Sequence, residues 1–168
     1  PVTVTAFDSA GNSSSRTFTV TVSDTTAPVL SVPSNVSVSA TSASGAVVTY
    51  PVATAMDNVT ASPTIGYSQA SGTVFPIGVT TVTVSASDAA NNVSAANFTV
   101  TVSDTTAPVL SVPSNVSASA ASTSGAVVTY PAATATDNVT ASPTISYSKA
   151  SGTTFAIRRT DCRSAHSA

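Results

Sequence analysis

The sequence repeats itself at a distance of 80 residues. The heptapeptide Asp-Thr-Thr-Ala-Pro-Val-Leu stands at residues 24–30 and returns at residues 104–110. At the same offset, residues 1–23 align with residues 81–103. Because a fixed period of this length is the signature of tandem structural units, the chain is predicted to be built from copies of one small domain.

The period divides the chain into four parts. Residues 1–23 are the last two strands of an incomplete repeat, residues 24–103 are a complete repeat, residues 104–157 are a repeat that lacks its last two strands, and residues 158–168 are a divergent tail. The tail breaks the apolar alternation and carries the only cysteine, Cys162, and the only histidine, His166. Either a specialised terminus or a shifted reading frame accounts for such a tail.

Apolar residues in the complete repeat follow the two-residue period of β-strands, and no helical period occurs. The long alternating strand is expected at residues 81–87, with Phe98, Val100 and Val102 pointing inward from the strand that follows. Shorter strands are expected at 29–32, 36–38, 46–50, 64–68 and 74–77, with a turn at Gly78. About seven short strands without helices predict an all-β fold of tandem immunoglobulin-like β-sandwiches.

Residues 71–92, SGTVFPIGVTTVTVSASDAANN, contain Ser-Gly, then Phe-Pro-hydrophobic-Gly, alternating Thr and Val, and finally Asp and Asn. This pattern resembles the HYR (hyalin-repeat) module, an immunoglobulin-like sandwich of extracellular proteins. The resemblance implies a bacterial-type extracellular or cell-surface protein and favours a part in adhesion. Many animal modules of this type carry cysteine pairs, whereas a single cysteine allows no intrachain disulfide here.

Composition argues against two classes of partner. Charged residues make up 7% of the chain and the net charge is -2, so no basic face for nucleic acid is expected. No apolar run approaches the ~18 residues that a membrane-spanning helix needs. The chain begins at Pro1 without a start methionine or a leader, which fits either a processed chain or a piece of a longer one.

Enzymatic activity is not expected. A nucleophilic serine or cysteine needs a neighbouring base, and the single histidine lies in the divergent tail. Cys162 beside Asp161 and near His166 is a weak pairing, and an ordinary chain end explains these residues far better than an activated thiolate. Four tyrosines are candidates for sugar stacking, but their strand positions favour the core instead: Tyr50, Tyr67, Tyr130 and Tyr147.

Six of the seven acidic residues recur at fixed positions in the loops of the repeat. In an immunoglobulin-like sandwich, Asp24, Asp57 and Asp88 would lie at the same pole. Carboxylate oxygens from several loops are ligands that calcium accepts, so these three residues are a candidate Ca²⁺ site. The alternative is that each aspartate caps its own turn.

The two incomplete ends together supply a whole repeat except for the counterparts of residues 78–80, which are expected in a turn. A hairpin of one chain is therefore predicted to complete the C-terminal repeat of the next by strand complementation, giving a head-to-tail homopolymer, a structural fibre or surface filament. The donor residues are Val2, Val4, Phe18, Val20 and Val22, and the acceptor residues are Leu110, Val128, Phe155 and Ile157. A fragment of a longer tandem array would show the same ends. A stalk or binding segment of an adhesin that recognises glycan or protein is the alternative function.

Overall fold

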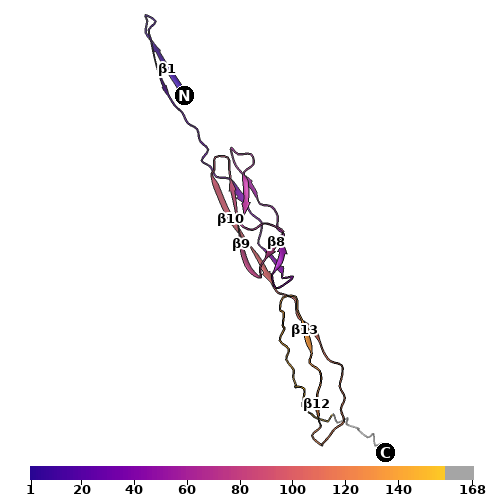
Figure 1. Cartoon of the computed structure of the whole chain (residues 1–168). Coiled ribbons are helices and arrows are strands. Elements are labelled where there is room, and N and C mark those ends of the chain that lie inside the picture. Colours follow the sequence, from indigo (N-terminus) through magenta and orange to yellow (C-terminus); the bar gives the residue numbers. More distant parts are fainter. Residues whose placement is uncertain (158–168) are drawn as a thin grey trace, which may run out of the picture. The chain divides into compact units, whose positions relative to one another are not determined.

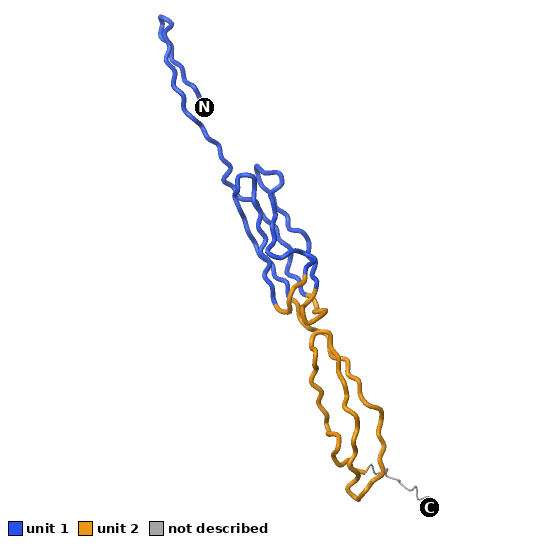
Figure 2. Tube along the Cα trace, in the orientation of Figure 1, with its two compact units in different colours: residues 1–37, 47–73, 79–101 blue, residues 38–46, 74–78, 102–168 orange. Residues whose placement is uncertain are grey.

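A computed structural model of the chain describes residues 1–157, and the divergent tail with Cys162 and His166 lies outside the described residues. Every regular element in residues 1–157 is a β-strand, which confirms the all-β prediction (Figure 1). The same residues contain no helix that could cross a membrane. The described residues form two compact units, one of residues 1–37, 47–73 and 79–101 and one of residues 38–46, 74–78 and 102–157 (Figure 2).

The N-terminal hairpin pairs β1 (Val2–Phe7) with β2 (Ser13–Phe18) in antiparallel register, from Val2 opposite Phe18 to Phe7 opposite Ser13. Its turn places Gly11 at a φ of 89°, a conformation that glycine adopts without a Cβ penalty. All side chains of the two strands are exposed. The hairpin therefore has two unpaired edges and no apolar cover.

The complete repeat contains one four-stranded sheet and two short strand pairs. The sheet has the order β4-β10-β9-β7, with β9 and β10 as its inner strands. Its strands are β4 (Val36–Ser39), β7 (Thr64–Tyr67), β9 (Gly78–Ser87) and β10 (Val93–Ser103). The pairs are β3 (Val29–Ser31) with β6 (Thr54–Met56), and β5 (Ala46–Val48) with β8 (Thr73–Phe75).

Three details differ from the strands predicted above. The repeat has eight strands rather than about seven, because β6, whose three residues show no apolar alternation, pairs with β3. Strand β8 ends at Phe75 rather than at Ile77, since Pro76 has no N–H to offer the ladder. Residues 78–80 begin β9 instead of forming a turn.

The core of the complete repeat follows the predicted strand phase. Val82, Val84 and Ala86 are 0% exposed, and Phe98 and Val100 lie buried on β10. Tyr50 packs its ring against Phe98 with centroids 4.9 Å apart. Alternate residues of the two inner strands thus form the buried face, as the period of a half-buried strand requires.

The C-terminal repeat retains only the two strand pairs. β11 (Val109–Ser111) pairs with β13 (Thr134–Thr136), and β12 (Ala126–Val128) pairs with β14 (Thr153–Phe155). Residues 116–119 and 144–147, the counterparts of β4 and β7, form no strand. In the complete repeat those edge strands pair with β10 and β9, whose counterparts are missing from residues 104–157. Residues 104–157 therefore form no counterpart of the four-stranded sheet.

Candidate functional site: an open groove and a carboxylate cluster

An open groove of about 870 Å³ lies in the C-terminal repeat where the complete repeat has its core. Six buried hydrophobic residues of the complete repeat precede residue 78: Ala40, Ala46, Val48, Tyr50, Ala53 and Phe75. All six counterparts line the groove: Ala120, Ala126, Val128, Tyr130, Ala133 and Phe155. The groove thus carries the counterparts of the first six core residues, and residues 104–157 contain no counterparts of the six core residues on β9 and β10.

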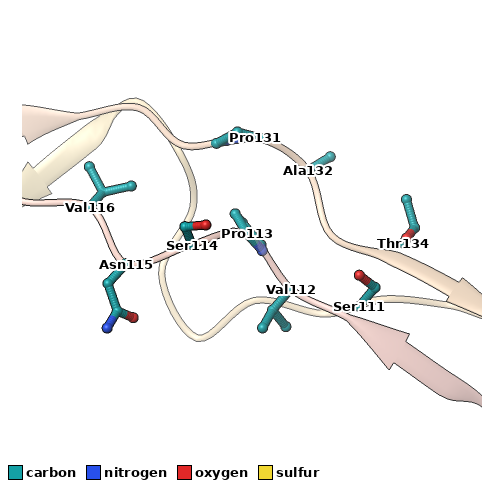
Figure 3. A pocket seen from close by; sticks show the side chains of 9 residues that line it. All are labelled: Ser111, Val112, Pro113, Ser114, Asn115, Val116, Pro131, Ala132 and Thr134. Carbon is teal, nitrogen blue, oxygen red and sulfur yellow. The ribbon is translucent and has the colours of Figure 1, made fainter.

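A second hollow of about 420 Å³ lies between residues 111–116 and residues 131–134 (Figure 3). Asn115 lies on its wall. In the complete repeat the matching residue, Asn35, accepts a hydrogen bond at Oδ1 from the backbone N–H of Thr99 on β10, at 2.8 Å. Since the C-terminal repeat has no such strand, Asn115 marks a position at which an incoming strand would find a ready acceptor.

The predicted acceptor residues fall into two groups. Val128, Phe155 and Ile157 line the groove, whereas Leu110 is exposed and lines neither hollow. Val112, Val116 and Tyr147 also line the groove, and they were not among the predicted acceptors. Comparison with the complete repeat at an offset of 80 would have found Tyr147, because Tyr67 packs beside Tyr50 at 5.8 Å between ring centroids.

The aromatic residues of the groove are more exposed than their counterparts, but the ring centroids of Tyr130 and Tyr147 lie 5.8 Å apart, as those of Tyr50 and Tyr67 do. Tyr147 is exposed, contrary to the predicted core position, because no sheet covers it. Tyr130 donates its hydroxyl hydrogen to the carbonyl of Lys149, as Tyr50 does to that of Gln69. The ammonium group of Lys149 lies over the ring of Phe155, 4.5 Å from the ring centroid. The tyrosine contacts within the groove therefore already have the geometry of the complete repeat.

The predicted donor residues are exposed apolar side chains. Val2, Val4 and Phe18 lie on the hairpin, and Val20 and Val22 follow it. Phe18 is 53% exposed, whereas its counterpart Phe98 is 3% exposed. Residues 19–23 form no strand, although their counterparts 99–103 belong to β10. The donor segment thus has the apolar pattern of β9 and β10 without the packing.

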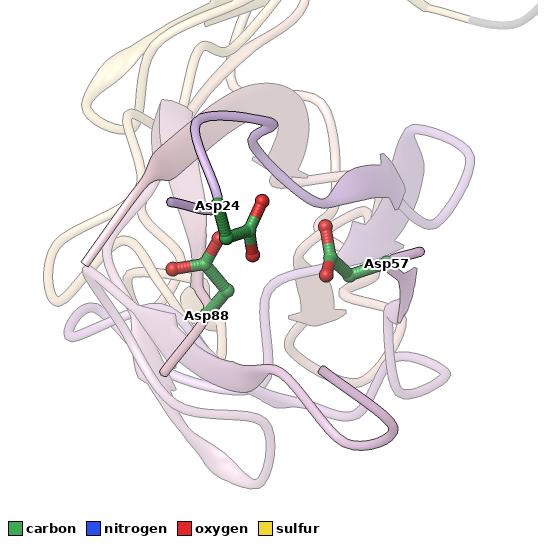
Figure 4. A group of neighbouring side chains, drawn as sticks. All are labelled: Asp24, Asp57 and Asp88. Carbon is green, nitrogen blue, oxygen red and sulfur yellow. The ribbon is translucent and has the colours of Figure 1, made fainter. Parts of the chain in front are cut away.

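The structure brings Asp24, Asp57 and Asp88 together at one end of the complete repeat (Figure 4). One carboxylate oxygen from each lies within 4.8 Å of one from each of the others. Asp24 precedes β3, Asp57 follows β6 and Asp88 follows β9. Three loops that are distant in sequence therefore present three negative charges to the same small volume.

One oxygen of Asp24 and one of Asp57 hold their own turns. Asp24 Oδ1 accepts a hydrogen bond from the N–H of Thr26 at 3.1 Å, and Asp57 Oδ2 accepts from those of Val59 and Thr60 at 2.8 and 2.7 Å. These backbone hydrogen bonds, first that of Thr60 and then that of Val59, lower the pKa of Asp57. One carboxylate oxygen of Asp24 and one of Asp57 therefore cap their own turns, as the alternative interpretation predicted.

The remaining oxygens, Asp24 Oδ2 and Asp57 Oδ1, are buried and have no hydrogen-bond partner. Asp88 is 7% exposed and accepts hydrogen bonds from the backbone and side-chain nitrogens of Asn92. Buried carboxylate oxygens without a partner are costly, and like charges at this separation repel. Turn capping leaves both of these costs uncompensated.

The spacing of the oxygens fits calcium. Ca²⁺ binds oxygen at about 2.3–2.6 Å, so two of its ligands lie at most about 5 Å apart. Mg²⁺ binds oxygen at about 2.0–2.1 Å, so two of its ligands lie at most about 4.2 Å apart. The three carboxylates would supply the charged ligands, and the side chains of Asp24, Asp57 and Asp88 lie close together around one small volume (Figure 4).

Comparison with known proteins identifies the complete repeat. A model of the HYR domain family matches residues 23–102. Neither a search of curated proteins nor a search of solved structures returned a match. HYR domains are non-enzymatic repeat domains that occur in extracellular proteins. The match agrees with the apolar alternation of β9 and with the all-β structure, and residues 23–102 are therefore similar to an HYR domain.

Proposed function

We propose that the chain is a structural subunit of an extracellular or cell-surface filament, assembled head to tail by strand complementation. The observation that carries the proposal is that the counterparts of the complete repeat's core residues lie in two separate segments, the C-terminal repeat and residues 1–23. Six core residues of the complete repeat precede residue 78, and the other six lie on β9 and β10. The counterparts of the first six line the groove, and those of the second six are Val2, Val4, Ala6, Phe18, Val20 and Val22.

The hairpin fits the place of the missing inner strands. β1 corresponds to residues 82–87 of β9, and β2 corresponds to residues 93–98 of β10. Inserted as a pair, the two strands would have residues 116–119 on one side and residues 144–147 on the other. Both unpaired edges of the hairpin would then be hydrogen-bonded, which is the usual gain in strand addition.

The complete repeat supplies the register of this docking. Thr99 N–H donates to Asn35 Oδ1 at 2.8 Å, and Ala40 N–H donates to the carbonyl of Ser103 at 2.8 Å. The matching bonds between two copies run from Thr19 N–H to Asn115 and from Ala120 N–H to the Ser23 carbonyl. Formation of these bonds would extend β2 through residues 19–23, as β10 extends through residues 99–103.

The symmetry of the contact between two copies determines which kind of assembly forms. Donor and acceptor are different surfaces at different parts of the chain, so the contact is heterologous and leaves a free donor and a free acceptor after each addition. Such a contact propagates into an open filament unless its rotation closes a ring. Adhesion through a stalk remains the alternative function, and the family match supports an extracellular, adhesion-like repeat protein in either case.

The test compares the 168-residue chain with a variant that lacks residues 1–23, using analytical ultracentrifugation and electron microscopy. The full chain is expected to form filaments. The deletion variant is expected to stay monomeric with residues 24–103 folded, because the buried core lies wholly within those residues. The synthetic hairpin 1–23 is expected to bind the deletion variant and to stop filament growth of the full chain. Filaments of the deletion variant, or a monomeric full chain, would contradict the proposal.

A further inference from the structure

We propose that the seam between two subunits holds a divalent-cation site made of Asp104 and Asp137 from one copy and Asp8 from the next, so that assembly depends on calcium. The inference rests on the proposed strand complementation and adds its regulation. At the offset of 80, these residues are the counterparts of Asp24, Asp57 and Asp88. One chain thus carries a whole cluster in its complete repeat and the separated parts of a second.

Two of the three carboxylates cap the same turns in the C-terminal repeat as their counterparts do in the complete repeat, although Asp104 is exposed and Asp24 is half-buried. Asp104 Oδ1 accepts from the N–H of Thr106 at 3.1 Å, the same distance as from Thr26 to Asp24. Asp137 Oδ2 accepts from the N–H groups of Val139 and Thr140 at 3.2 and 3.4 Å, longer than the 2.8 and 2.7 Å of the matching bonds to Asp57. Asp137 Oδ1 is buried without a hydrogen-bond partner, as Asp57 Oδ1 is. The acceptor side therefore offers a buried, unpaired oxygen before any donor arrives.

The third carboxylate is preformed on the donor hairpin. Asp8 accepts from the backbone N–H of Asn12 at 2.8 Å and from its side-chain Nδ2 at 2.7 Å. Asp88 accepts from Asn92 at the same two distances. The turns also share a left-handed residue at the same position, Gly11 at a φ of 89° and Asn91 at 67°. Asp8 can therefore enter the seam without a change in its turn.

Docking changes the electrostatics of Asp8. The residue is exposed on the hairpin, whereas its counterpart Asp88 is buried in the cluster. Insertion therefore moves a carboxylate out of water and places it beside two others. Without a cation, this step combines desolvation with like-charge repulsion. A bound Ca²⁺ compensates both, and because it needs ligands from both copies, it links donor to acceptor.

Three chains test the inference: the wild type, Asp8→Asn and, as a matched control, Asp57→Asn. Asparagine retains the Oδ1 that accepts from the Ala10 and Asn12 N–H groups of the hairpin turn, but removes the charge of the seam ligand. The control removes a ligand from the complete repeat and leaves the seam intact. Sedimentation is recorded in EDTA, in excess Ca²⁺ and in excess Mg²⁺, and bound calcium per subunit is measured by titration calorimetry.

Wild-type filaments are expected to lengthen at least tenfold when Ca²⁺ replaces EDTA and to respond less to Mg²⁺, with two calcium ions bound per subunit. Asp57→Asn is expected to keep the calcium response and bind one ion. Asp8→Asn is expected to lose the response and bind one ion. Wild-type filaments of equal length in EDTA and Ca²⁺, or an Asp8→Asn variant that still responds, overturn the cation site while the strand complementation stands. A wild type that forms no polymer under any of the three conditions overturns both.

Discussion

Phe98 meets Tyr50 edge to face in the complete repeat, with ring centroids 4.9 Å apart and an angle of 70° between the ring planes. Both rings are buried. The equivalent residues of the incomplete ends are Phe18, which is exposed on the hairpin, and Tyr130, which lines the groove. Loss of the Phe98–Tyr50 contact is therefore expected to affect folding, whereas loss of the contact between Phe18 and Tyr130 is expected to affect the proposed assembly.

Phe98→Ala is expected to destabilise the complete repeat by about 3–5 kcal/mol, because it removes a buried aromatic side chain and leaves a cavity. Thr101 lies on the same strand with its side chain on the opposite face, so Thr101→Ala is expected to cost under about 0.5 kcal/mol. Urea unfolding of the two variants measures both values. Equal costs would mean that the strand phase of β10 is shifted by one residue.

Phe18→Ala is expected to weaken subunit association by about 2 kcal/mol, or roughly thirtyfold, if Phe18 is the anchor that meets Tyr130. Thr17→Ala is the matched control. It is expected to leave the association constant unchanged, because Asn97, the counterpart of Thr17, is exposed in the complete repeat. Sedimentation equilibrium gives the association constants, and urea unfolding of residues 24–103 should not change. If Phe18→Ala leaves the association constant at the wild-type value, Phe18 is not part of the interface.

Gly45→Ala is expected to destabilise the complete repeat by more than about 3 kcal/mol. Gly45 has a φ of 111°, and a Cβ built there lies 1.9 Å from the carbonyl oxygen of Phe75. Gly72 is the matched control because its φ is also positive, at 82°, but a Cβ there meets nothing within 4 Å. Gly72→Ala should therefore show only the conformational cost, about 1–2 kcal/mol. Thermal unfolding of both variants separates crowding from backbone strain.

Calcium is expected to raise the melting temperature of the complete repeat if Asp24, Asp57 and Asp88 bind it. At a free concentration one hundred times the dissociation constant, the added stability is about 2.7 kcal/mol. Asp24→Asn should abolish most of this increase, because Asp24 contributes one of the buried free oxygens. Differential scanning calorimetry with and without EDTA makes the comparison. Superimposable wild-type curves would show that the cluster binds no calcium under these conditions.

The strands that the sequence predicted best are those whose side chains alternate between core and solvent. Val82, Val84, Phe98 and Val100 are buried as predicted, because the two-residue period directly encodes which face of a strand is covered. Short strands without that period were less predictable. β6 is held by its pairing with β3 rather than by an apolar pattern of its own, and Leu110, predicted to belong to the acceptor core, is 57% exposed.

The repeat, the all-β class, the HYR resemblance and the positions of the loop aspartates are determined by the sequence itself, since each depends on local residue order or on a fixed offset. Only the tertiary structure decides which residues meet. It brings Asp24, Asp57 and Asp88 within 4.8 Å, and it shows that residues 116–119 and 144–147 stay unpaired although their sequences resemble those of strands. Both outcomes are non-local: a carboxylate cluster needs three loops at one pole, and an edge strand exists only when the inner strand beside it is present.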